Sequence, residues 1–198
     1  MVLSDKFEQA LRYAAHVHAG QNQKGTTIPY MAHLLGTASI VLEYGGTEDE
    51  AIAALLHDAA EDAGGAGRLE DIRARFGECI ADLVEGCTDT MQRPKPAWRA
   101  RKAGYIARVP KLSASARLVS AADKLNNTRA MLRELRQCGD EVWKRFKGGR
   151  EGTLWYYRCL VQAFRTAGAT AIVDELDRTV AEIEKFVANE KQTSPTIW

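Results

Sequence analysis

Hydrophobic residues recur along most of this chain at intervals of three and four positions, which is the spacing of an amphipathic α-helix. The first such segment contains Phe7, Leu11 and Ala14. Segments of this kind predict helices near residues 5–19, 29–44, 51–62, 69–76, 80–87, 97–109, 113–135, 154–164 and 172–187. No segment alternates polar and apolar residues as a half-buried β-strand does. We therefore expect an all-α fold, a bundle of about eight to ten helices.

Local signals mark where these helices start and stop. The sequence Thr47-x-x-Glu50 is typical of a capping box and predicts the start of the helix over 51–62. Gly20 and the pair Gly45-Gly46 follow two earlier helices, where glycine often ends a helix. No linker or repeat divides the 198 residues. We expect one domain over 1–198, with a core over about 4–190 and a frayed tail over 191–198.

Composition and charge exclude several classes of protein. The net charge of +1 lacks the excess of basic residues that binding to a nucleic-acid polymer requires. Charges begin at Asp5, so the N-terminus has no apolar run typical of a signal peptide, and no stretch approaches the roughly 18 apolar residues of a membrane span. The four cysteines have no CxxC spacing, and we expect mostly packed, reduced thiols. These features together favour a protein of the cytoplasm.

The strongest chemical signal is the segment His57-Asp58-x-x-Glu61-Asp62, which follows an apolar run. On a helix, Glu61 lies about one turn after His57 and Asp62 about one turn after Asp58, so the four polar side chains form one patch. Three carboxylates and an imidazole on a partly buried face repel one another unless a cation or a proton lies between them. The segment alone is also compatible with the solvated end of a helix.

Two further residues favour a metal site. His33 lies near the start of the predicted helix 29–44, on the side of its apolar residues. Asp123 lies in the middle of an apolar helix, where an unpaired carboxylate is unfavourable, although an exposed or salt-bridged aspartate is the alternative. The nitrogens of His33 and His57 with the oxygens of Asp58 and Asp123 suit Mn²⁺ or Fe²⁺, with positions left for water. Zn²⁺ is a further candidate, but it more often has fewer carboxylate ligands.

The order of these residues resembles the HD superfamily of metal-dependent phosphohydrolases. The match includes Gly20-Gln21, Lys24, Pro29-Tyr30-x-x-His33, His57-Asp58-x-x-Glu61-Asp62 and Ala122-Asp123-Lys124-Leu125-x-Asn127-x-Arg129. Over about residues 4 to 165 the chain is similar to the hydrolase half of the RelA/SpoT homologues, most of all to their single-domain members, the small alarmone hydrolases. The HD pair alone is a weak signal, whereas the combination is specific. A hydrolase without a synthetase domain is implied.

The resemblance implies a reaction and a set of site residues. Such enzymes use Mn²⁺ to remove pyrophosphate from the 3′ position of (p)ppGpp and, in some members, of (p)ppApp, by attack of a metal-activated water. By analogy the metal ligands are His33, His57, Asp58 and Asp123. Glu61 and Asp62 match the acidic pair that orients the attacking water and accepts its proton, and Asn127 matches a residue that contacts the substrate near the scissile phosphate. Lys24 and Tyr30 match a loop that contacts the nucleotide.

Other residues depart from the family pattern or have two interpretations. The family commonly has Arg where this chain has Gln23, so a stacking contact with guanine is lost, and the preference between guanine and adenine stays open. Five basic residues either bind outer phosphates or form a solvated face: Arg99, Arg101, Lys102, Lys147 and Arg150. Tyr157 either covers the nucleotide or packs in the core. His18 resembles a family position, and we expect it to be a structural histidine.

Two other functions are compatible with the same residues. One is an HD phosphohydrolase that acts on another nucleotide, which Gln23 allows and the matches at Glu61, Asp62 and Asn127 disfavour. The other is a noncatalytic helical module that senses a nucleotide or a metal, although a sensor does not need an acidic pair to position water. The expected partner is a small nucleotide, and the apolar helices permit a homodimer without requiring one.

Overall fold

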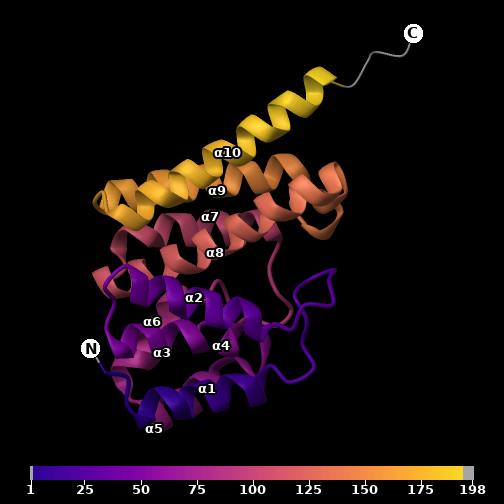
Figure 1. The fold of residues 1–198 in the computed structure, drawn as a ribbon. Helices are drawn as coiled ribbons and strands as arrows, with labels where there is room; N and C mark the ends of the chain where they lie inside the picture. Colours follow the sequence, from indigo (N-terminus) through magenta and orange to yellow (C-terminus); the bar gives the residue numbers. More distant parts are fainter. Residues whose placement is uncertain (1, 194–198) are drawn as a thin grey trace.

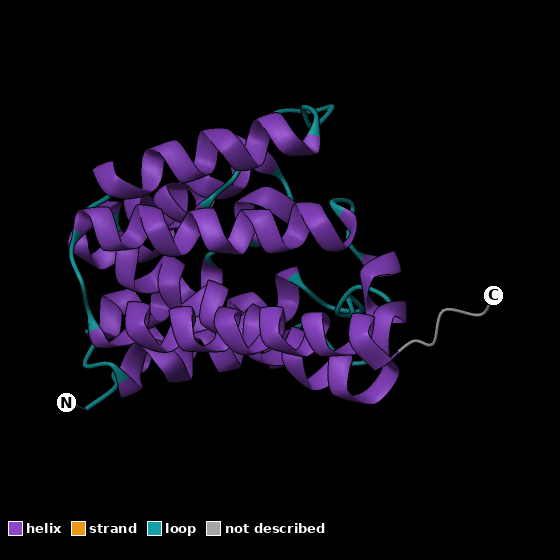
Figure 2. Cartoon of the chain, turned by 90° about the horizontal axis from the view of Figure 1, so that it is seen from above, coloured by secondary structure: helices purple, strands orange, loops and turns teal. Residues whose placement is uncertain are grey.

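The computed structural model describes residues 2–193, and within this range it contains helices and no β-strand (Figure 2). The bounds of the helices, including two 3₁₀ helices η1 and η2, are α1 Asp5–Val17, α2 Met31–Glu43, α3 Glu48–Leu56, α4 Ala59–Asp62, α5 Gly65–Phe76, α6 Glu78–Cys87, α7 Trp98–Arg108, η1 Val109–Lys111, α8 Ala114–Cys138, η2 Gly139–Arg145, α9 Gly149–Ala167 and α10 Ala171–Thr193. The prediction of an all-α fold is confirmed. No helix in the described range is both long enough and apolar enough to cross a bilayer.

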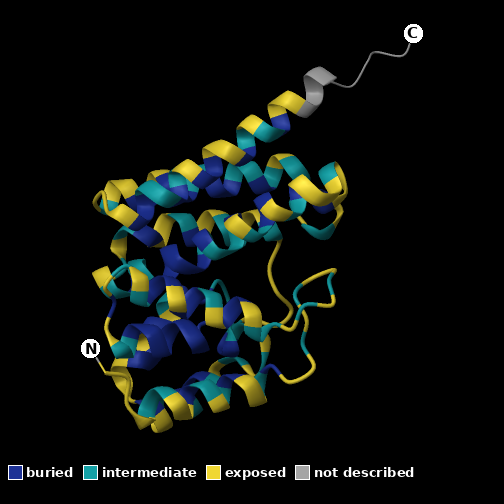
Figure 3. Cartoon of the chain, in the orientation of Figure 1, coloured by how far each residue is buried: buried dark blue, intermediate teal, exposed yellow. Residues whose placement is uncertain are grey.

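The helix α8 holds the two halves of the molecule together. It contacts α2, α3 and α6 from the N-terminal half and α9 and α10 from the C-terminal half. In Figure 1 these two groups lie below and above α8. Helix α3 is buried from Glu50 to Leu56 and is the dark-blue helix in the lower half of Figure 3. One hydrophobic core contains residues from Ala10 to Val187.

The predicted helix over 51–62 is two helices in the structure. The capping box of Thr47 and Glu50 is present and opens α3 at Glu48. The helix ends at Leu56, and α4 begins only after His57 and Asp58. The Nδ1 atom of His57 lies 2.8 Å from the Ala54 carbonyl oxygen, which an uninterrupted α-helix uses to accept the N–H of Asp58. This competition explains why the helix is interrupted at the two residues with the strongest chemical signal, although the backbone of both stays in the right-handed helical region.

Three smaller expectations also change. Arg150 precedes the helix predicted over 154–164, but α9 begins at Gly149, so Arg150 is helical. Of the frayed tail expected over 191–198, residues 191–193 are helical because α10 continues to Thr193, and 194–198 lie outside the described residues. The four cysteines are free thiols as expected, yet Cys79 and Cys138 are exposed rather than packed.

Candidate active site

The predicted metal ligands meet between α2, the junction of α3 with α4, and α8. The Nε2 atoms of His33 and His57 are 3.2 Å apart. Asp58 Oδ2 lies 3.0 Å from Nε2 of His57 and 3.5 Å from Nε2 of His33. Asp123 Oδ1 lies 3.4 Å and 3.6 Å from the same two nitrogens. The ligand atoms of the two histidines and Asp58 form the tightest group, all within 4.8 Å of one another, and Asp123 approaches the imidazoles rather than Asp58.

These side chains fit a divalent metal ion. Ligand atoms about 2.1 Å from an ion and at right angles to each other are about 3 Å apart, which is the scale of these contacts. The Nδ1 atom of His57 donates to the Ala54 carbonyl, so its Nε2 atom can present a lone pair to the cluster. Burial lowers the pKa of His57, but the charges of Asp58 and Asp123 outweigh burial and raise it well above its usual range. The negative field that holds a proton on His57 also favours a bound cation.

Each carboxylate ligand is oriented by neighbouring side chains. The Tyr30 hydroxyl donates to Asp58 Oδ2 at 2.5 Å. Burial and the charge of Asp58 raise the pKa of Tyr30, so this phenol stays a donor. Asn127 Nδ2 donates to Asp123 Oδ1 at 2.6 Å, and the Lys124 ammonium pairs with Asp123 Oδ2. Such contacts fix the direction in which a ligand presents its oxygen atoms.

Glu61 and Asp62 lie on α4 beside the cluster, but their surroundings differ. Both oxygens of Glu61 have partners, because Lys95 Nζ lies 2.8 Å from Oε1 and the backbone N–H of Asp89 donates to Oε2 at 3.1 Å. Asp62 Oδ2 accepts a hydrogen bond from Gln21 Nε2 at 3.0 Å. Burial and neighbouring negative charge raise the pKa of Asp62. Asp62 is therefore better placed than Glu61 to accept a proton.

Comparison with known proteins identifies the family. Residues 10–154 match the HD domain family. The chain belongs to this family. It is 38% identical over 138 residues to the guanosine-3′,5′-bis(diphosphate) 3′-pyrophosphohydrolase MESH1 of Xenopus tropicalis, and the match covers 68% of this chain and 72% of that protein. The human MESH1 is 37% identical over 140 residues, with the same two coverages.

Two solved structures are similar to this chain in fold and in sequence. A structure described as a metazoan ortholog of SpoT that hydrolyses ppGpp has a TM-score of 0.75 and 28% identity, and the match covers 92% of this chain and 98% of that one. A Listeria monocytogenes EGD-e protein has a TM-score of 0.69 and 33% identity, with coverages of 77% and 99%. The resemblance that the sequence motifs indicate is thus confirmed.

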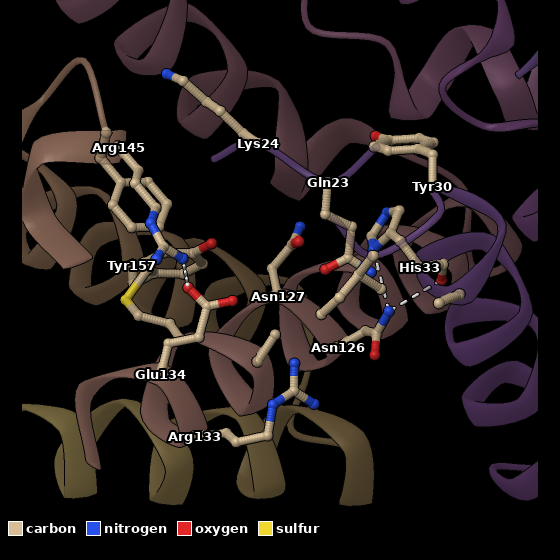
Figure 4. Close-up of a pocket in the computed structure, with 15 residues that line it drawn as sticks. Gln23, Lys24, Tyr30, His33, Asn126, Asn127, Arg133, Glu134, Arg145 and Tyr157 are labelled. Atoms are coloured by element: carbon tan, nitrogen blue, oxygen red, sulfur yellow. Dashed lines mark hydrogen bonds and ion pairs between the residues drawn. The ribbon is translucent and has the colours of Figure 1, made fainter. Parts of the chain in front are cut away.

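Three cavities surround the HD site. The Gln23 cavity, of about 370 Å³, lies between the segment over 23–33 and α8 and is drawn in Figure 4. The acidic cavity, of about 210 Å³, is lined by Asp58, Asp123 and both residues of the acidic pair. The lysine cavity, of about 340 Å³, is lined by five cationic side chains: Lys24, Arg101, Lys102, Lys124 and Lys147. Asn127 lines all three cavities, and it lies near the middle of the view in Figure 4.

The residues expected to contact the nucleotide lie at different points around these cavities. Lys24 lines both the Gln23 cavity and the lysine cavity. The Tyr30 ring lines the Gln23 and acidic cavities, while its hydroxyl is bound to Asp58. Tyr157 is buried and lines the Gln23 and lysine cavities, so its side chain has both of the environments considered from the sequence.

The five basic residues with two interpretations divide into two groups. Arg101, Lys102 and Lys147 line the lysine cavity. The Arg99 guanidinium lies 3.2 Å from the centre of the Trp155 ring, and Arg150 pairs with Asp140 at 3.1 Å. These last two cations line none of the cavities described above.

Sequence reasoning assigned no role to three residues that support the site. Asn126 Nδ2 lies 2.9 Å from the His33 carbonyl oxygen and 3.0 Å from its Nδ1 atom. Lys124 lines both the acidic and the lysine cavities, and its position beside Asp123 in the motif was an available signal. The Asp89 side chain is 6% exposed and lies 2.9 Å from Lys102, and it also pairs with Arg101. No motif included Asp89, so only the fold shows that it holds these cations.

Proposed function

We propose that this chain hydrolyses the 3′-pyrophosphate of (p)ppGpp or (p)ppApp and releases pyrophosphate. The main support is the meeting of three cavities at Asn127, beside the cluster of two histidines and two aspartates. A nucleotide with phosphates on both its 3′ and 5′ positions needs a site for the reacting phosphates, a cavity for the nucleoside and a cationic cavity for the other phosphates. The relatives named as 3′-pyrophosphohydrolases of guanosine bis(diphosphate) belong to the same family.

The side chains of this site have separate tasks in the proposed reaction. A divalent ion held by the four ligands supplies acidification of water and polarisation of a phosphoryl oxygen. Asp62 accepts the proton of the attacking water, because desolvation and the charge of Asp58 raise its pKa and its second oxygen, Oδ1, lies as far as 4.0 Å from Lys95. Glu61, held by its two partners, orients that water. Lys102 and Lys124 line the acidic cavity and stabilise the charge that develops on the leaving pyrophosphate.

The identity of the ion is proposed from the donor atoms of the site. The compartment and the oligomeric state are proposed from the sequence. We favour Mn²⁺, because two imidazole nitrogens and two carboxylate oxygens form a mixed donor set, and Fe²⁺ and Zn²⁺ are the alternatives. A location in the cytoplasm and a homodimer remain predictions of the sequence. The substrate is a small nucleotide rather than a polymer, since five cationic side chains gather in the lysine cavity.

Metal-stripped protein is expected to be inactive and to release pyrophosphate from ppGpp or ppApp after it is reloaded with Mn²⁺. The products are separated by anion exchange, and each substrate is incubated separately. Release of pyrophosphate together with the nucleoside 5′-diphosphate supports the proposal. Binding of Mn²⁺ without cleavage of either substrate contradicts it, and other nucleotides would then be compared before a noncatalytic sensor is accepted.

Gln23→Arg is expected to raise the preference for ppGpp over ppApp by a factor of about two to five. An arginine at this edge of the Gln23 cavity restores a guanidinium that stacks on the base, a contact of about 0.5–1 kcal/mol at exposed sites. The measurement is the ratio of kcat/KM for the two substrates. Gln23→Lys is the matched control, because it adds the charge without a planar group. An equal change in both variants would contradict a stacking role.

A further inference from the structure

The segment from His18 to Tyr30 folds back on itself behind the acidic pair. Gly20 has a φ of +75°, a left-handed conformation that favours glycine. This turn lets the Gln21 N–H donate to the His18 carbonyl at 3.0 Å, and the Tyr30 N–H donates to the Gln21 carbonyl at 2.9 Å. The side chains of His18, Gln21 and Tyr30, from the two ends of the loop, are therefore held close together.

Gln21 connects His18 to the acidic pair. Its Nε2 atom donates to Asp62 Oδ2 at 3.0 Å, and its Oε1 atom lies 2.7 Å from His18 Nδ1. An ionised carboxylate only accepts hydrogen bonds, so the NH₂ group of Gln21 faces Asp62 and its carbonyl oxygen faces His18. Nδ1 of His18 must then carry a proton and donate it. The carboxylate thus determines both the orientation of the amide and the tautomer of the histidine.

The other contacts of His18 also agree with a proton on its Nδ1 atom. His18 is 2% exposed, and its Nε2 atom has no hydrogen-bond partner within the described part of the chain. A buried nitrogen without a partner is tolerated best as an acceptor, which agrees with a proton on Nδ1. The imidazole also stacks on the Tyr30 ring, with centroids 5.1 Å apart and planes inclined by 27°. Tyr30 in turn binds the metal ligand Asp58.

We propose that His18 and Gln21 are positioning residues that hold the Asp62 carboxylate in the direction in which it accepts the proton of the attacking water. The inference rests on the proposed hydrolysis. Nδ1 of His18 is connected to Asp62 through Gln21, and the face of the His18 ring packs against Tyr30. Within the described part of the chain, neither residue forms a hydrogen bond or an ion pair with the four candidate metal ligands, so we expect an effect on turnover rather than on metal affinity.

Paired substitutions separate these two contacts of His18. His18→Phe keeps a ring against Tyr30 and removes the donor, and Gln21→Leu removes the connection to Asp62. Both are expected to lower kcat by about 10- to 100-fold, the range for removing an outer-shell partner of a site, with KM and Mn²⁺ affinity changed less than about threefold. His18→Asn places an amide N–H near the position of Nδ1 and is expected to recover part of kcat. His16→Phe is the control, since His16 is exposed two residues earlier.

Full kcat in both His18→Phe and Gln21→Leu would overturn the positioning role, as would a loss of Mn²⁺ affinity that matches the loss of kcat. Failure of His18→Asn to exceed His18→Phe in kcat would also count against it. Thermal unfolding of each variant shows whether the fold is retained.

Nitrogen-15 NMR of the imidazoles in metal-free and Zn²⁺-loaded protein tests the contact without turnover. We expect a proton on Nδ1 of His18, with this preference lost in Gln21→Leu. A proton on Nε2 would overturn the inference. If the unaltered protein cleaves neither alarmone, the proposed function fails. The NMR result alone then decides whether hydrogen bonds connect His18 to Asp62 through Gln21.

Discussion

Asp58→Asn is expected to lower the affinity for Mn²⁺ by more than 100-fold and to reduce pyrophosphate release by about 1000-fold or more. Removal of a side chain that orients a metal ligand typically costs 10- to 100-fold, and Asp58 would itself hold the ion, so a larger loss is expected. The Asp58 oxygen lies 3.0 Å from Nε2 of His57, within the cluster of ligand atoms. Asparagine keeps the size of the side chain and an oxygen that accepts from Tyr30, so the fold is expected to survive.

Calorimetric titration of Mn²⁺ into metal-stripped protein measures the affinity, and anion exchange measures the product. Asp82→Asn is a matched control, because its side chain is 62% exposed and pairs with Arg73 away from the site. The control should bind Mn²⁺ and release pyrophosphate like the unaltered protein. Unchanged Mn²⁺ affinity in Asp58→Asn would show that the ion binds elsewhere, and the assignment of the four ligands would be wrong.

Lys124→Met is expected to destabilise the metal-free protein by about 3 kcal/mol, and the Mn²⁺-loaded protein by less. Breaking a buried ion pair costs about 3–5 kcal/mol, and the lower end applies because His33 and His57 still neighbour Asp123. Burial would lower the pKa of Lys124, but Asp123 raises it well above its usual range, so the ammonium is charged. A bound cation supplies positive charge beside Asp123 after the lysine is lost.

Chemical denaturation with and without Mn²⁺ measures this difference in stability. Lys144→Met is the control, because Lys144 is 74% exposed and pairs only with Glu141 among the contacts described. Its free energy of unfolding should change by less than about 0.5 kcal/mol. Equal destabilisation of Lys124→Met in both metal states would contradict an electrostatic link between Lys124 and the metal site. A raised KM is also expected, since Lys124 lines two of the cavities.

The helices and the family could be predicted from the sequence because the features that indicate them are local. Hydrophobic spacing and capping residues act within a few positions, so patterns such as Thr47-x-x-Glu50 predicted real boundaries. The break at His57 and Asp58 was missed, because a side chain competes there for the Ala54 carbonyl, and no periodic pattern reports such a competition. The side chain with the strongest chemical signal thus changed the local backbone.

The candidate metal ligands could be predicted from the sequence, whereas the residues that orient them or hold nearby cations could not. The candidate ligands were predicted because their order and residue types match a specific combination of motifs, and the structure places the aspartate oxygens 3.0 to 3.6 Å from the histidine nitrogens. Asp89 and Asn126 belong to no motif, and their roles depend on neighbours that are distant in the sequence. Of the basic residues, Lys102 reaches the lysine cavity whereas Arg99 stacks on Trp155, a distinction that charge alone does not make.

Residue spacing and motif order therefore sufficed for the all-α class, the HD family and the candidate ligands, because each depends on contacts within a helix turn or on residue identity. The tertiary structure alone decided which cations face the cavities, that the Tyr30 hydroxyl binds Asp58, and that Gln21 joins His18 to Asp62. The contacts with Asp58 and Asp62 join residues that are 28 and 41 positions apart in the sequence. Their geometry is set by how α2, α4 and α8 pack, and that packing leaves no periodic trace in the chain.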